Sequence, residues 1–251
     1  MSNPTQIDLK FEPPRATVTF RTQDGLNVMS ASCFNRLESV VAELGRRPDI
    51  RFCLFKAEGK VWIAGADIAE LSAMDKAQAR KLSVRGNEVL DALEMLPCVT
   101  VAVLQGAALG GGYETALACD FRIAVGSAKI GLPETALGLI PGWGGIKRIA
   151  RLTSSTIARR LVFSAGMISA AEGKALGLVD EVVEKPEQLD GAVETLLATL
   201  RRGGPHAVGR AKRALLTGDE VDAFADCFTA GESREGMAAF FEKRAATWME
   251  K

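Results

Sequence analysis

The sequence contains few of the residues from which most metal sites and histidine-based active sites are built. Its 251 residues include a single histidine, His206, and five cysteines that are widely spaced and form no CxxC pair. This scarcity argues against metal sites made of several His or Cys ligands, and it leaves a Ser-His-Asp triad only one possible base. His206 lies in Arg-Arg-Gly-Gly-Pro-His, a loop that leads into a helix start, so we expect it to serve helix capping or to face solvent. The cysteines are Cys33, Cys53, Cys98, Cys119 and Cys227.

The sequence also lacks net charge and long apolar runs. Lys and Arg together number 31, as do Asp and Glu, so there is no sign of the broad basic face that nucleic-acid binding requires. A local basic patch could still hold a phosphorylated cofactor. No apolar run approaches the ~20 residues that span a bilayer, and residues 1–8 lack the pattern of a signal peptide. We therefore expect a cytoplasmic protein with reduced, mostly buried thiols and no membrane partner.

The first half of the chain alternates strand and helix signals, whereas the second half is mainly helical. Together they predict an α/β core over 1–185 and a helical C-terminal region over 186–251, forming a single functional unit. The predicted strands cover 16–20, 50–55, 99–104, 121–125 and 178–183. The predicted helices cover 30–44, 69–96, 113–118, 144–151, 156–163, 170–175, 186–202, 205–217 and 222–248.

A run of glycines between a predicted strand and a predicted helix is the first candidate site. In residues 105–114, Gln-Gly-Ala-Ala-Leu-Gly-Gly-Gly-Tyr-Glu, an apolar strand leads through three glycines into a helix whose first turn carries Glu114. Backbone N–H groups at a helix start lack partners and carry partial positive charge, which suits a developing oxyanion. The spacing is neither that of a dinucleotide-binding turn nor that of a P-loop. Taken alone, such a turn is better explained by tight helix–strand packing, with Glu114 favoured by the helix dipole.

A second carboxylate, Glu134, follows Ile-Gly-Leu-Pro in a constrained loop, and residues 138–145 form a second glycine-rich stretch. Two carboxylates near one set of amide donors could catalyse a reaction with a water molecule, with one carboxylate acting as base and the other as acid. Alone, Glu134 is better explained as a solvated loop residue.

These segments resemble the crotonase (enoyl-CoA hydratase/isomerase) family in their order and spacing. The resemblance covers nearly the whole chain. The matching segments are Ile63–Ile68 (IAGADI), Leu109–Glu114 (LGGGYE), Cys119-Asp120, Gly131–Glu134 (GLPE), Gly138–Gly142 (GLIPG), Ala175–Val179 (ALGLV) and Arg234–Arg244 (REGMAAFFEKR).

The resemblance implies a crotonase-like spiral of ββα units with a helical C-terminal trimerisation region, assembled as a trimer or a dimer of trimers. It implies an acyl-CoA substrate, so that coenzyme A is present only as part of the substrate and no cofactor is permanently bound. By matching positions, Glu114 and Glu134 are the catalytic glutamates, and the N–H groups of Ala66 and Gly111 form the oxyanion hole. The implied substrate-binding residues are Ala64, Ala66, Asp67, Ile68, Gly111, Gly142 and Lys243, the last toward the CoA phosphates.

Retention of both glutamates favours an enoyl-CoA hydratase, which adds water in syn fashion to a 2-enoyl-CoA and gives a 3-hydroxyacyl-CoA. An enoyl-CoA isomerase, or a hydratase for cyclic or branched acyl groups, is the alternative on the same scaffold. A non-catalytic RNA-binding or scaffolding relative is an alternative of another class, and the neutral charge gives it little support.

Four departures from the common family pattern put the substrate in doubt more than the fold. Ala69 stands where many hydratases have lysine, and the segment 21–29 lacks a usual proline. Tyr113 and Trp143 stand where smaller residues are frequent, so both are candidates for the acyl pocket, with ordinary packing as the alternative.

Overall fold

The computed structural model describes residues 4–250, with only the backbone of Glu250, and its strands form two sheets. The larger sheet has the order β1-β2-β3-β5-β7-β10, in which β1 pairs antiparallel with β2 and the other neighbours are parallel. The smaller sheet has the order β4-β6-β8-β9, with β9 antiparallel. The larger sheet consists of β1 (Gln6–Glu12), β2 (Arg15–Arg21), β3 (Phe52–Ala57), β5 (Val99–Leu104), β7 (Phe121–Val125) and β10 (Glu181–Val183), and the smaller of β4 (Val61–Ile63), β6 (Ala107–Leu109), β8 (Lys129–Gly131) and β9 (Met167–Ser169).

From β3 to β8, consecutive strands enter different sheets and each pair is followed by a helical segment, which produces the predicted spiral of ββα units. β3 and β4 lead to α2 (Ile68–Ser72) and α3 (Lys76–Glu94), and β5 and β6 lead to α4 (Gly111–Leu117). β7 and β8 lead through the 3₁₀ turn η1 (Pro133–Leu137) to α5 (Gly145–Leu152). Because each helix begins just after a strand of the small sheet, several helix starts gather near its edge.

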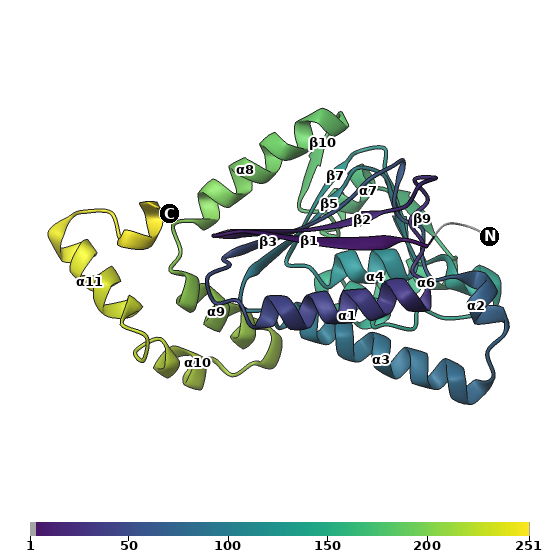
Figure 1. Ribbon diagram of the computed structural model, residues 1–251, viewed down its shortest axis with the longest axis horizontal. Helices are drawn as coiled ribbons and strands as arrows, with labels where there is room; N and C mark the ends of the chain where they lie inside the picture. Colours follow the sequence, from purple (N-terminus) through teal and green to yellow (C-terminus); the bar gives the residue numbers. More distant parts are fainter. Residues whose placement is uncertain (1–3, 251) are drawn as a thin grey trace.

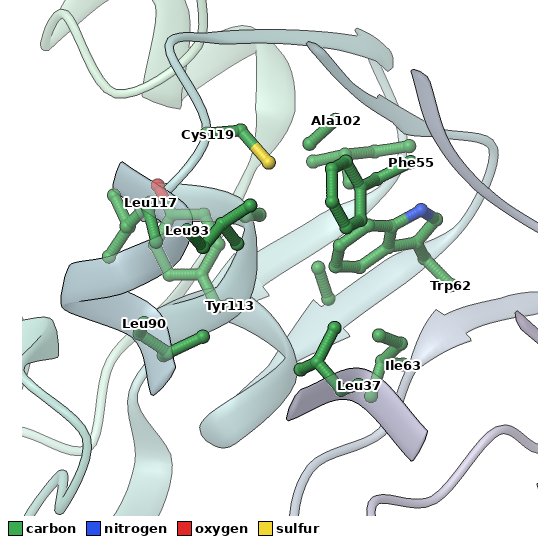
Figure 2. Close-up of a cluster of buried hydrophobic side chains, with 14 of the residues drawn as sticks. Leu37, Phe55, Trp62, Ile63, Leu90, Leu93, Ala102, Tyr113, Leu117 and Cys119 are labelled. Carbon is green, nitrogen blue, oxygen red and sulfur yellow. The ribbon is translucent and has the colours of Figure 1, made fainter. Parts of the chain in front are cut away.

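The large sheet is covered on both faces, as its apolar central strands require. In β5, Val99, Val101 and Val103 face the cluster formed with α8 (Leu189–Leu200), while Ala102 and Leu104 face the main core. α1 (Ala31–Gly45) and α3 lie together on the opposite side of the sheet from α8 (Figure 1). The main core includes side chains from α1, α3, α4 and the strands, such as Leu37, Leu90 and Trp62 (Figure 2).

The C-terminal region is helical but more interrupted than the sequence suggested. It contains α8, α9 (Pro205–Thr217), α10 (Glu220–Asp226), α11 (Glu232–Glu242) and the 3₁₀ turns η2 (Pro186–Gln188) and η3 (Thr247–Glu250), and it follows α6 (Ser155–Phe163) and α7 (Ala170–Ala175) at the end of the predicted core. The continuous helix predicted over 222–248 is therefore wrong. Gly231 and Lys243 adopt left-handed backbone angles, φ +75° and +55°, that an α-helix cannot contain.

The cysteines follow the predicted pattern of burial. Cys33, Cys53, Cys98 and Cys119 are buried, Cys227 is half-buried, and all five are free thiols. Within residues 4–250, no helix combines the length and apolarity needed to cross a membrane.

Candidate active site

A cavity with a volume of about 640 Å³ lies where several helix starts meet. Its inner end is formed by buried residues, including Gly111, Glu114 and Trp143. Its rim carries exposed apolar side chains, Ile68, Leu137, Leu139 and Ile140. A deep polar end with an apolar rim is the usual form of a small-molecule site.

Glu114 is a buried carboxylate held by two backbone N–H groups. Gly110 precedes α4 at φ +53°, ψ −129°, a conformation suited to glycine, and the helix then carries Glu114 in its first turn. Glu114 Oε1 accepts hydrogen bonds from the N–H groups of Trp143 and Gly145, each at 2.8 Å. Burial raises the pKa of Glu114, and these two amides oppose the rise, as does the charge of Arg148. Since Gly145 begins α5, the carboxylate also lies at a positive helix end.

Glu134 has a different environment. It follows Pro133 in η1 and is half-buried, and its Oε2 has no hydrogen-bond partner within residues 4–250. Burial raises the pKa of Glu134 to about 7, and the nearby charge of Glu114 acts in the same direction. The two glutamates line one cavity, but one carboxylate receives two hydrogen bonds and the other has an unpaired oxygen. Burial raises the pKa of both carboxyls, so the two groups differ in their hydrogen-bond partners rather than in the direction of the pKa shift.

The amides of Ala66 and Gly111 border the same cavity. Gly111 is the first residue of α4, so its N–H has no acceptor within the helix. The Met29 N–H donates to Gly65 O at 2.8 Å, and the Asp67 N–H donates to Met29 O at 3.3 Å. Because successive N–H groups of an extended segment alternate in direction, the Ala66 N–H points away from Met29. The two predicted oxyanion donors are thus brought to one site from segments 45 positions apart in the sequence.

One polar face of α3 holds the loop that hydrogen-bonds to Glu114. Ser83 Oγ and Asn87 Nδ2 donate to Gly142 O at 2.7 and 2.8 Å. Arg148, fully buried, donates to Trp143 O at 2.8 Å and to Asp91 Oδ1 at 2.6 Å. Sequence reasoning missed these residues. The available signal was the spacing of Ser83, Asn87 and Asp91, which places them on one side of the predicted helix.

The sequence model of the family described as enoyl-CoA hydratase/isomerase matches residues 15–251. The chain belongs to this family. It is 34% identical over 249 residues to the short-chain-enoyl-CoA hydratase of Clostridium acetobutylicum, covering 95% of each chain. It is also 34% identical over 256 residues to the crotonyl-CoA hydratase of Syntrophomonas wolfei, covering 98% of each.

Solved structures of enoyl-CoA hydratases have the same fold. The enzyme from Bacillus anthracis matches with a TM-score of 0.87 at 31% identity, covering 98% of this chain and 99% of the other. An enzyme from Geobacillus kaustophilus matches with a TM-score of 0.90 at 28% identity, covering 96% of each chain. The predicted membership of the crotonase family and the predicted crotonase-like fold are both confirmed.

In this enoyl-CoA hydratase/isomerase family member, the two unusual aromatic residues have different positions. Trp143 lies on the cavity wall, with 5% of its surface exposed. Tyr113 is fully buried in the core beside Leu90, Leu93 and Leu117, and its hydroxyl donates to Leu178 O at 3.4 Å (Figure 2). Consecutive helical residues point about 100° apart, so a helix that turns Glu114 to the cavity turns Tyr113 away. The acyl-pocket prediction for Tyr113 is therefore replaced by core packing.

The residues predicted to bind the CoA ester fall into two groups. Those near the glycine turn all line the cavity: Ala64, Ala66, Asp67, Ile68, Gly111 and Gly142. Lys243 instead ends α11, which lies at the opposite end of the molecule from α2 (Figure 1). Lys243 therefore does not line the cavity of its own chain.

His206 lies outside this site. It is the second residue of α9, its N–H donates to Glu232 Oε2 at 3.0 Å, and its Nε2 lies 3.2 Å from Asp226 O. The helix start predicted there is confirmed. The part of the chain that the structure describes contains no group of three or more His, Cys, Asp or Glu residues placed to hold a metal ion.

Proposed function

We propose that the chain is an enoyl-CoA hydratase, a hydro-lyase that converts a 2-enoyl-CoA and water into a 3-hydroxyacyl-CoA. One observation carries the proposal: two glutamates with different hydrogen-bond partners line the cavity that Ala66 and Gly111 also line. The hydratase names of the relatives from Clostridium acetobutylicum and Syntrophomonas wolfei support it.

The environments suggest a division of labour between the glutamates. Two amide donors stabilise the charged form of Glu114, which suits a base that takes a proton from water. Glu134, with a pKa of about 7 and an unpaired oxygen, suits an acid that holds a proton at neutral pH. The sequence left this choice open, and the assignment proposed here rests on these hydrogen bonds and on the raised pKa of Glu134.

In the proposed reaction, water bound to Glu114 attacks the β-carbon while its proton passes to the Glu114 carboxylate. The electron pair of the double bond moves toward the thioester oxygen, and the N–H groups of Ala66 and Gly111 stabilise this enolate. Glu134 then gives its proton to the α-carbon from the same face. The proton gained by Glu114 returns to Glu134 through solvent before the next turnover. Side chains of the protein take the proton from water and give one to the substrate, so the proposal needs no resident cofactor.

Hydration of crotonyl-CoA, followed as loss of the enoyl-thioester absorbance, tests the proposal. We expect turnover whose kcat/KM falls about tenfold per pH unit above pH ~7, because the protonated form of Glu134 is then lost. A kcat/KM that rises through pH ~7 would reverse the roles of the two glutamates. Absence of turnover with short, medium and cyclic 2-enoyl-CoAs would overturn the function.

The C-terminal helices support assembly into a homo-oligomer, a trimer or a dimer of trimers. Val221, Phe224, Phe228, Phe240 and Phe241 are each more than half exposed on or beside α10 and α11. So many exposed apolar side chains on neighbouring helices usually mark a protein interface. Light scattering should give a multiple of the 26.7 kDa chain mass, and a monomer at micromolar concentration would contradict the proposal.

A further inference from the structure

The indole of Trp143 closes the inner end of the cavity. It packs against Phe34, with ring centroids 4.9 Å apart, and its backbone N–H donates to Glu114. A Cβ built on Gly111 would lie 2.3 Å from Cζ3 of the indole. The side chain therefore touches the residue that supplies one oxyanion donor, while its backbone holds the proposed base. An acyl chain that extends inward past the reacting carbons meets this ring.

A second glycine makes room for the indole. Gly86 lies within α3, where glycine costs about 1 kcal/mol relative to alanine in helix propensity. A Cβ at this position would lie 2.0 Å from Cδ1 of Trp143. The indole thus occupies space that two missing side chains create, one from α3 and one from α4. The indole is fixed in this position, because Gly86 contacts one edge of the ring and Gly111 contacts another.

Behind the wall lies a second, smaller cavity of about 30 Å³. Residues on α1 and near α2, including Ala31, Phe34 and Met74, line it but do not line the main cavity. Five residues line both cavities and so form the partition: Ala66, Asp67, Leu71, Leu82 and Trp143. Trp143 is by far the largest of these, so its removal joins the two spaces.

We propose that Trp143 is a specificity-determining residue that restricts the substrate to short, uncharged acyl groups of about four carbons. This inference rests on the proposed function. The ionisable side chains among the described residues that line the main cavity are Asp67, Glu114 and Glu134, which are all acidic. An acyl group with a second carboxylate would meet no positively charged side chain there.

The test compares four-carbon and eight-carbon substrates in Trp143→Ala. The ratio of kcat/KM for crotonyl-CoA to that for 2-octenoyl-CoA should be high in the wild type and fall at least about tenfold in the variant, since even one methylene in an apolar pocket changes the rate about 10-fold or more. Met74→Phe added to Trp143→Ala refills the rear cavity and should restore part of the ratio. Met74→Phe alone is the matched control and should leave the ratio unchanged.

An unchanged ratio in Trp143→Ala would overturn the inference while the observed hydration upheld the function. Calorimetric binding of the saturated analogues butyryl-CoA and octanoyl-CoA gives a readout that needs no turnover. The variant should improve octanoyl-CoA affinity relative to butyryl-CoA by a similar factor. Equal relative affinities in wild type and variant would overturn the inference even if the protein hydrated nothing.

Discussion

Replacing Glu114 or Glu134 with glutamine should lower the hydration rate of crotonyl-CoA by about 10²–10⁴-fold, the usual contribution of a positioned acid or base. Glutamine keeps the shape of each side chain, and its amide oxygen can still accept from the Trp143 and Gly145 N–H groups in Glu114→Gln. KM should therefore change much less than kcat. Because the two groups act in one proton exchange, the double variant should be little slower than the slower single variant. Stopped-flow and steady-state assays at pH 7 provide the measurement.

The free energy of unfolding at alkaline pH shows whether the Glu134→Gln protein is folded. It also shows whether the charged form of Glu134 destabilises the wild-type fold. Burial raises the pKa of Glu134 to about 7, so the stability it contributes below its unfolded value of about 4.5 is lost as pH rises through 7. Glu134→Gln should then be more stable than wild type at pH 8 by about 2 kcal/mol. Glu187→Gln, at an exposed position in η2, is the matched control for both measurements. Full hydratase activity in both single variants would show that these carboxylates do not perform the chemistry.

Arg148→Met should destabilise the fold by about 3 kcal/mol, the cost of breaking a buried ion pair from one side. Arg148 is fully buried, and its Nε lies 3.2 Å from Glu94 Oε2, a carboxylate whose side chain is 12% exposed. Methionine leaves that carboxylate with only the exposed Arg151 as partner, and it leaves Trp143 O without its donor. The urea midpoint at fixed protein concentration measures the loss. Activity should fall as well, because the loop that hydrogen-bonds to Glu114 loses its anchor.

Two comparison variants separate the effect of burying an ion pair on stability from the effect of removing a charge alone. Arg21→Met removes an exposed ion pair with Asp8 and should leave the midpoint almost unchanged. Adding Glu94→Gln to Arg148→Met removes the stranded charge and should recover part of the lost stability. A midpoint for Arg148→Met equal to that of Arg21→Met would contradict the role assigned to the buried network.

The large elements of the fold could be predicted because their sequence patterns agree with their burial. The apolar run 99–104 became a strand covered on both faces, and the spaced apolar residues of 30–44 became α1. The short strands β4, β6, β8 and β9 have three residues each, too few to show any alternation. The break at Gly231 depends on a single left-handed residue, which a helical composition over 222–248 conceals.

The residues of the candidate site could be predicted where a side chain carries the chemistry. They were harder to predict where a backbone amide carries it, or where a buried residue holds the loop in place. Glu114 and Glu134 are carboxylates in unusual surroundings, and family resemblance placed Ala66, whose methyl group gives no chemical signal. Tyr113 was assigned to the acyl pocket because it stands where smaller residues are frequent, but the helix turns it toward the core. Arg148 was missed because a charged residue in a short helix is usually exposed, and only the fold brings it beside Glu94.

The most direct test of the account is the product formed from crotonyl-CoA in water enriched in ¹⁸O. Mass spectrometry of the purified wild-type reaction should show a 3-hydroxyacyl-CoA that carries one ¹⁸O on its β-carbon, with Glu114→Gln and Glu134→Gln forming it far more slowly. A product that contains no solvent oxygen, such as an enoyl-CoA with a shifted double bond, would show that the two glutamates perform isomerisation and would contradict the proposed hydration.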